Sequence, residues 1–334
     1  MDAPDSPTNS SSGSPRTDPS AHALAELLWA ELLRGGPPER LAALANEWHA
    51  ARGHKWAPGD ADRLLAAAAA CGGHAPLCAT AREWGATDYR LMALGAARAG
   101  HERICALARE WALAEPGPAG RDSPRALSYD RMLRAAASGA HARVCELIAS
   151  WGEADADQML FGGAYRGHRA VCERARELGA TGFGHMLHLA ASGGHPAICR
   201  LALSWGAADV DQMLRSGARG GHREVCELAR ELGATDVEWM LHLAAEEGHE
   251  SICVLARAWG AADMDRMLRG AARGGRGPLC VLAREWGATD YDGMVAAAVD
   301  GGCPARERLH ELAEQWRTDD TPNAAQAAAA PDPQ

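Results

Sequence analysis

The sequence has almost no lysine and few aromatic residues other than tryptophan. Its 334 residues include 2 Phe, 4 Tyr and 11 Trp, and Lys55 is the only lysine among 34 basic residues. All-β and doubly wound α/β folds draw on aromatic and β-branched residues, so this alanine-rich chain favours closely packed helices. The excess of alanine, glycine and arginine is also typical of GC-rich coding.

Long apolar stretches and export signals are missing as well. The longest uncharged apolar run, from Leu64 to Cys71, is far shorter than the ~20 residues that a membrane-spanning helix needs. The N-terminus has neither the basic nor the apolar segment of a secretory signal. We therefore expect an intracellular protein, in the cytoplasm or the nucleus, with no membrane contact and with its ten cysteines reduced.

Basic residues are fewer than acidic ones, 34 against 44, so the formal net charge is -10. Binding to a phosphate backbone needs a concentrated basic face. The charge balance therefore predicts that nucleic acid is not the partner.

Cysteine and methionine recur along the chain at one fixed interval, the 27-position step that leads from Cys199 to Cys226. The residues that keep this period are Cys78, Cys105, Cys145, Cys172, Cys199, Cys226, Cys253 and Cys280, with Met92, Met132, Met159, Met186, Met213, Met240, Met267 and Met294. The steps to Cys145 and to Met132 are longer, because a segment rich in Pro and Gly is inserted at 115–127, where we expect a loop. A fixed period of this length predicts a solenoid of stacked supersecondary units.

Each repeat carries the start and stop signals of two helices. An acid such as Asp209 precedes the first apolar stretch and a second acid, Asp211, follows it, which is typical of an N-cap and of a first turn that favours negative charge. Gly221 ends the first helix, and glycines equivalent to Gly206 end the second. The repeat is therefore predicted to be a helical hairpin.

The residues of this hairpin resemble the ankyrin repeat. The stretch MLHLAASGGHPAICRLALSWGA, from Met186 to Ala207, places LHLAA, GH and GA at the internal spacings of that family, and the resemblance covers about 27–316. The repeat is shorter than that of the family, which has about 33 residues, and the missing part lies where ankyrin repeats carry a β-hairpin finger. A residue such as Arg257 replaces the third leucine of the pattern, and we expect the Trp or Leu two residues later to compensate.

The resemblance implies an all-α solenoid of about ten stacked helix-turn-helix repeats over 23–316, without fingers. The short form is similar to the divergent ankyrin-like repeats of giant DNA viruses and some protists, so the protein would act in a host cell if it is viral. Ser/Pro-rich residues 1–22 and Ala/Pro-rich residues 317–334 are predicted to be disordered tails.

Seven repeats carry a His-x-x-x-Cys pair, which could in principle bind metal. The pairs are His74/Cys78, His101/Cys105, His141/Cys145, His168/Cys172, His195/Cys199, His222/Cys226 and His249/Cys253. Zinc needs four converging ligands, whereas helices stack ~8–10 Å apart, so we favour a buried Cys and a His bonded to the backbone. The repetition also argues against a catalytic Cys/His pair, because catalysis needs one special site and not the same pair in every repeat. We expect no cofactor and no catalysis.

A row of tryptophans occupies one position near the end of each second helix. Its members are Trp84, Trp111, Trp151, Trp205, Trp259 and Trp286, with Leu178 and Leu232 substituting twice. This interchange favours hydrophobic packing over a ligand-binding ladder.

Variation between the repeats indicates where a partner could bind. The position two residues after each repeat's methionine holds Arg134, Phe161, His188, Arg215, His242 and Arg269 in succession. The sequence leaves two interpretations open, a contact surface for a partner protein or an ordinary solvated stripe.

The function that these features favour is a monomeric, non-catalytic scaffold for an unidentified protein partner. One alternative, implied by viral ankyrin proteins, is an adaptor that recruits a host ubiquitin ligase through an F-box-like motif, for which we expect the segment after Trp316 to be too short. The other is a metal-binding protein that uses the His-x-x-x-Cys pairs.

Overall fold

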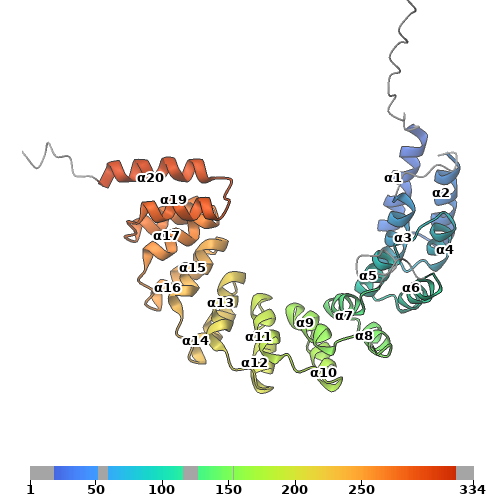
Figure 1. Cartoon of the computed structure of the whole chain (residues 1–334), viewed down its shortest axis with the longest axis horizontal. Coiled ribbons are helices and arrows are strands. Elements are labelled where there is room, and N and C mark those ends of the chain that lie inside the picture. Colours follow the sequence, from blue (N-terminus) through green and yellow to red (C-terminus); the bar gives the residue numbers. More distant parts are fainter. Residues whose placement is uncertain (1–18, 52–58, 116–126, 153, 321–334) are drawn as a thin grey trace, which may run out of the picture. The chain divides into compact units, whose positions relative to one another are not determined.

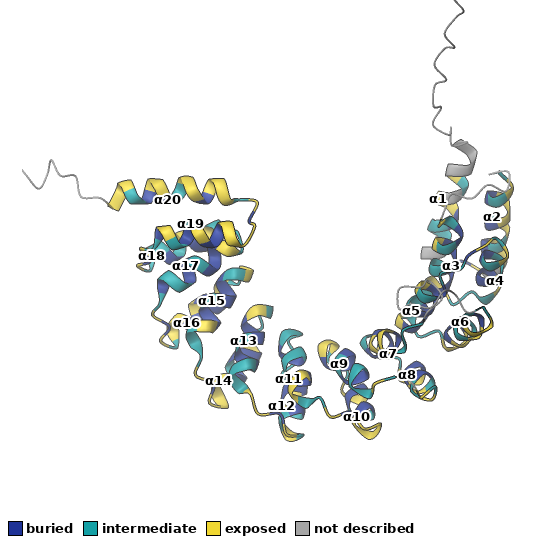
Figure 2. Ribbon diagram, in the orientation of Figure 1, coloured by how far each residue is buried: buried dark blue, intermediate teal, exposed yellow. Residues whose placement is uncertain are grey.

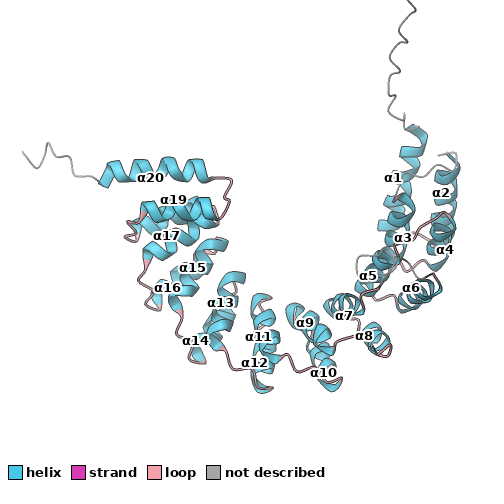
Figure 3. Ribbon diagram, viewed as in Figure 1, coloured by secondary structure: helices cyan, strands magenta, loops and turns pink. Residues whose placement is uncertain are grey.

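The computed structural model describes residues 19–51, 59–115, 127–152 and 154–320. Throughout these ranges the regular elements are helices, and no strand occurs among them (Figure 3). The prediction of an all-α fold is confirmed. None of the described helices combines the length and apolar character that crossing a membrane requires.

The chain divides into two compact units, 1–136 with 143–153, and 137–142 with 154–334. We call them the N-terminal and C-terminal units. Helices wholly or mainly in the N-terminal unit are α1 (Pro19–Leu33), α2 (Pro38–Ala51), α3 (Asp60–Cys71), α4 (Ala75–Glu83), α5 (Tyr89–Ala99), α6 (Glu102–Ala114), α7 (Tyr129–Ser138) and α8 (Ala142–Ala149). Those in the C-terminal unit are α9 (Ala156–Arg166), α10 (Arg169–Glu177), α11 (Phe183–Ser192), α12 (Pro196–Ser204), α13 (Val210–Gly220), α14 (Arg223–Glu231), α15 (Val237–Glu247), α16 (Glu250–Ala258), α17 (Met264–Arg273), α18 (Gly277–Glu285), α19 (Tyr291–Asp300) and α20 (Arg306–Asp320).

Neighbouring helices pack in the order of the sequence. Helix α13, for example, packs against α14 in its own repeat and against α11 and α15 in the adjacent repeats. In the C-terminal unit the odd-numbered helices form one layer and the even-numbered helices α10–α18 the other (Figure 1). This arrangement is consistent with a helical repeat solenoid, in which each repeat buries its apolar side against its neighbours.

The predicted helix signals explain where these helices begin and end. The Asp209 carboxylate accepts a hydrogen bond of 2.7 Å from the Gln212 N–H and caps α13. Gly221 then ends α13 with a φ of 73°, a backbone conformation that glycine adopts without steric penalty. One repeat breaks this rule, because Ala140 takes a φ of 61° at the corresponding turn.

The periodic residues form the core. Met213, Met240, Cys226 and Cys253 are completely buried, and Figure 2 shows the buried residues concentrated where neighbouring helices meet. Their small or flexible side chains allow close helix approach, so the sequence period marks the buried faces.

The helical region extends beyond both predicted boundaries. Helix α1 begins at Pro19 rather than at residue 23, and α20 continues past 316 to Asp320. The extra turn of α20 is explained by Asp320, which accepts hydrogen bonds from the Arg284 guanidinium at 2.8 Å and from the Tyr291 hydroxyl. The rest of the predicted tails, and 116–126 of the predicted insertion loop, lie outside the described residues.

Candidate interaction surface

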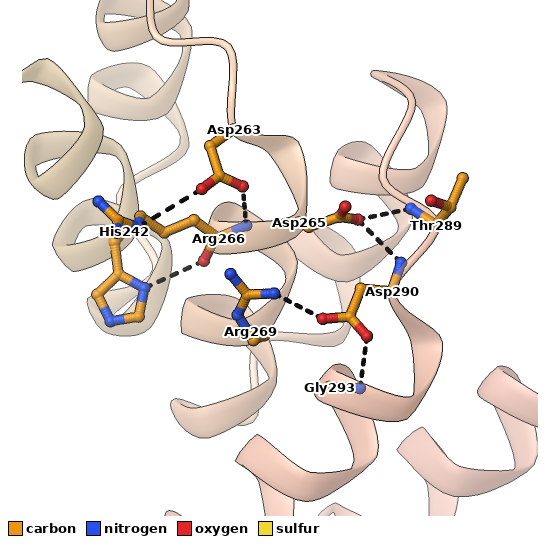
Figure 4. Close-up of polar contacts among 8 residues, drawn as sticks. All are labelled: His242, Asp263, Asp265, Arg266, Arg269, Thr289, Asp290 and Gly293. Atoms are coloured by element: carbon orange, nitrogen blue, oxygen red, sulfur yellow. Dashed lines mark hydrogen bonds and ion pairs between the residues drawn. The ribbon is translucent and has the colours of Figure 1, made fainter.

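Acids in the first turn of several odd-numbered helices connect one repeat to the next. Asp265 Oδ1 on α17 accepts hydrogen bonds from the backbone N–H groups of Thr289 at 2.7 Å and Asp290 at 2.9 Å (Figure 4). Equivalent bonds are made by Asp62, Asp157, Asp211 and Glu238. The sequence predicted only that such an acid would favour the helix N-terminus, whereas its carboxylate also satisfies unpaired donors one repeat away.

The repeated histidines make a second contact between repeats. His249 Nε2 lies 3.0 Å from the Arg219 carbonyl oxygen at the end of α13, and His222 makes the same contact with Ser192. Because a carbonyl can only accept, each Nε2 carries the proton. Arg276, which replaces histidine in one repeat, donates to the Glu246 carbonyl at 3.2 Å.

The turn glycine makes room for this histidine. A Cβ added to Gly221 would lie 2.7 Å from Nδ1 of His249, so glycine is required here for space as well as for its positive φ. The His partners predicted from sequence are therefore backbone atoms, but they belong to the preceding repeat rather than to the local turn.

The cysteine of each pair faces the core. Cys226 Sγ is completely buried and lies 4.0 Å from the Leu214 carbonyl oxygen, and burial raises the pKa of its thiol to about 12. Within the described ranges, no three His, Cys, Asp or Glu side chains form a group that could hold a metal ion. In pairs such as His222/Cys226 the two members thus have separate structural contacts.

The tryptophan row packs against arginines of the preceding repeat. The Arg230 guanidinium carbon lies 6.0 Å from the centre of the Trp259 ring, and that of Arg176 lies 4.8 Å from the Trp205 ring. The same stacking joins Arg82 to Trp111, Arg109 to Trp151, Arg257 to Trp286 and Arg284 to Trp316. The arginine at the position of the third leucine therefore contacts the tryptophan of the next repeat.

The two exceptions in the tryptophan row support this pairing. Leu178 and Leu232 replace tryptophan, and the residues at the arginine position one repeat earlier are Ala149 and Leu203. From Trp111 onward, tryptophan and arginine thus occur together or are absent together. The row is explained by contacts between repeats, which need no ligand.

The residues predicted to bind a partner lie on odd-numbered helices and also contact the next repeat. Arg215 and Arg269 donate to the N-cap carboxylates of Asp236 at 2.9 Å and Asp290 at 2.6 Å. His242 Nδ1 lies 3.1 Å from the Arg266 carbonyl oxygen (Figure 4).

The remaining members of the predicted row are less alike. His188 Nδ1 lies 2.6 Å from the Ser216 hydroxyl, and burial lowers the pKa of His188, which favours the neutral imidazole. The Phe161 ring meets His185 edge to face at a centroid distance of 4.4 Å. Arg134 is exposed on α7, in the N-terminal unit, whereas the other five residues belong to the C-terminal unit.

Two shallow hollows meet at Trp239 on the odd-numbered helices. One is lined by His188, Gln212, Arg215, Ser216, Arg219, Trp239 and Leu243, and the other by Trp239, His242, Arg266, Arg269, Arg273, Gly293, Ala296, Ala297 and Asp300. Their volumes are about 330 and 360 Å³. We call these residues the Trp239 surface; it lies wholly in the C-terminal unit.

Part of the Trp239 surface was missed from sequence. The predicted row supplied His188, Arg215, His242 and Arg269, but Trp239 lies one position before the repeat methionine and was not considered. Its signal was a departure from the repeat pattern, because no other repeat carries tryptophan at that position.

A comparison of the chain with protein-family models finds no match, and a comparison with curated protein sequences finds none either. The functional argument therefore depends on the sequence and on the geometry above.

Proposed function

We propose that this protein is a non-catalytic interaction scaffold built from short ankyrin-like repeats, which binds a partner protein along its odd-numbered helices. The observation that carries the proposal is Trp239, which is 43% exposed between two hollows and whose position in other repeats holds no tryptophan. Exposed Trp and Arg side chains are the residue types that contribute most to protein interfaces.

The distribution of the repeated residues supports the same proposal. The His, Cys, Trp and first-turn acid rows are engaged in contacts within and between repeats, as His249, Cys226, Trp286 and Asp265 illustrate. The residues that differ between repeats, such as Trp239, Arg215 and Arg269, have no role common to all repeats, and they line the two hollows. A rigid scaffold with variable side chains on fixed helices suits recognition without chemistry.

The ankyrin-like assignment is supported by the hairpins themselves. The GH turn joins the two helices in most repeats, as at Gly194 and His195, and the GA motif follows the second helix, as at Gly206 and Ala207. The described connections between repeats contain no strand, in keeping with a form that lacks fingers.

Affinity capture tests the proposal. The full chain should recover a specific partner from the cells in which it occurs, and the charge reversals Arg215→Glu and Arg269→Glu should abolish that recovery. Arg200→Glu and Arg223→Glu are the matched control, because they make the same charge change in exposed ion pairs on the even-numbered helices. Retention of every partner by a folded Arg215/Arg269 variant would contradict the proposal.

A further inference from the structure

Trp239 is an outlier that the packing of the repeats does not require. The residues at its position in the other repeats of the C-terminal unit are Gln158, His185, Gln212, Arg266 and Gly293. These differ in size and polarity, so the position has no common role in stacking. A large aromatic side chain that is 43% exposed at such a position is suited to contact with another molecule.

Arginines around Trp239 are held in place before any partner arrives. The Arg266 guanidinium carbon lies 5.1 Å from the centre of the Trp239 ring. Arg269 is held by Asp290 and Arg215 by Asp236, each through one terminal nitrogen (Figure 4 shows the Arg269 contact). A guanidinium has five N–H donors, so these pairs orient the group and leave further donors for a carboxylate. Orientation in advance reduces the entropy lost on binding.

The hollow beside Trp239 has a floor of very small residues, Gly293, Ala296 and Ala297. In the repeat before, the positions of Gly293 and Ala296 hold the larger Arg266 and Arg269. The floor is therefore small and apolar, and it leaves room for an apolar side chain beside the indole.

The charge that lines the two hollows is mainly positive. Five arginines line them, at 215, 219, 266, 269 and 273, whereas Asp300 is the only carboxylate among the lining residues. Four of these arginines also form ion pairs with acids outside the lining, namely Arg215 with Asp236, Arg219 with Glu247, Arg266 with Asp263 and Arg269 with Asp290. The lining itself nevertheless presents mainly basic side chains. It favours a ligand that brings carboxylates to both sides of an apolar group.

We propose that the Trp239 surface binds an extended acidic segment of a partner protein, in which an apolar side chain stands between two carboxylates. Arg215 and Arg269 lie two repeats apart, which corresponds to ~20 Å at a typical helix spacing of ~10 Å. Since an extended chain advances ~3.3 Å per residue, the two carboxylates are about six residues apart, with the apolar side chain midway at Trp239. This inference rests on the proposed scaffold function and specifies its ligand.

A single-stranded nucleic acid is the competing ligand, since arginine and tryptophan also bind phosphates and bases. Glu246 lies between Arg219 and Arg273 at the equivalent helical position, and Glu247 forms an ion pair with Arg219. These carboxylates interrupt the continuous basic track that a phosphate backbone follows. The observations therefore favour a peptide.

Selection from a random dodecapeptide library on the full chain tests this inference. The enriched peptides should carry two Asp or Glu residues at the separation given above, with an apolar residue between them. Their affinity should fall at least tenfold with Trp239→Ala and with Arg269→Glu, and should be unchanged with Arg223→Glu. Thermal melting followed by circular dichroism verifies that each variant remains folded.

Three outcomes would overturn the inference. The first is that the selection enriches neutral or basic peptides, or enriches none. The second is that a folded Trp239→Ala variant binds the enriched peptides as tightly as the unchanged chain. The third is that a dodecameric oligothymidylate binds more tightly than the peptides through the same residues. If affinity capture still returns a partner that Trp239→Ala retains, the acidic-segment inference fails while the scaffold proposal stands. If capture returns no specific partner, the scaffold proposal itself fails.

Discussion

The guanidinium carbon of Arg257 lies 4.5 Å from the centre of the Trp286 ring in the next repeat. The contact recurs at Trp205 and Trp259, and both residues are replaced together where tryptophan is absent. Neighbouring repeats are thus matched in pairs. A repeat whose second helix carries arginine is suited to a following repeat that carries tryptophan.

This matching predicts a coupling energy between Arg257 and Trp286. Arg257→Leu and Trp286→Leu should each lower the free energy of unfolding, since a cation–π pair contributes about 0.5–1 kcal/mol. The double variant should lose less than the sum of the two, because Leu203 and Leu232 already provide an aliphatic pair elsewhere in the chain. Urea unfolding of the four proteins measures the coupling. Strict additivity would contradict the matching, and Arg200→Leu controls for loss of an exposed arginine.

Helix α11 lacks the first-turn acid at residue 184, so adding one there tests whether this acid stabilises the contact between adjacent repeats. Gly184 occupies the position of Asp211 and Asp265 in α11, and a Cβ there would have no neighbour within 4 Å. The carboxylate of Gly184→Asp should accept hydrogen bonds from the backbone N–H groups of Ala208 and Asp209 and raise the free energy of unfolding by about 2 kcal/mol. Gly184→Ala isolates the gain in helix propensity. If the two variants are equally stable, the acid does not connect the repeats.

Ala140 predicts a second stabilising substitution. It is the only described residue other than glycine with a positive φ, and the equivalent turns use glycine. Ala140→Gly should raise the free energy of unfolding by about 1 kcal/mol, because it removes the strain of a left-handed alanine. Gly221→Ala should do the reverse, since its Cβ would also meet His249. Thermal melting of both variants checks the sign of each effect.

The buried thiols predict a loss of stability at alkaline pH. Burial raises the pKa of Cys226 and its seven equivalents to about 12, whereas an unfolded thiol titrates at ~8.5. The folded state then holds more protons between these values, so the stabilisation is complete below pH ~8.5 and is lost as pH rises towards 12, by up to ~1.4 kcal/mol per pH unit for each thiol.

Urea unfolding from pH 7 to pH 10.5 measures this dependence. Cys226→Ala should lower stability at pH 7 but make its decline with pH less steep, because one thiol no longer titrates. Cys71→Ala, at an exposed cysteine, should leave the decline unchanged. An identical decline in all three proteins would show that the buried thiols do not control it.

The periodic residues predicted the helical hairpins because their burial depends only on the repeat and its neighbour. Met213 and Cys226 recur at fixed positions, and their spacing sets the two helices and the turn. The partners of Arg257 and Asp265 were not predicted, since each lies in the following repeat and the alignment of adjacent helices is set by tertiary packing. Trp239 was missed because a pattern taken over all repeats discards the residue that departs from it.

The central claim is that each repeat is stabilised by itself and its immediate neighbours. Deletion of 236–262 removes one complete repeat and joins Thr235 to Asp263, so that Arg230 meets Trp286 as it met Trp259. Circular dichroism should show unchanged mean helicity per residue and cooperative melting, whereas deletion of 236–255, which removes only part of a repeat, should disrupt both. Loss of structure in the whole-repeat deletion to the same extent as in the partial deletion would contradict the account.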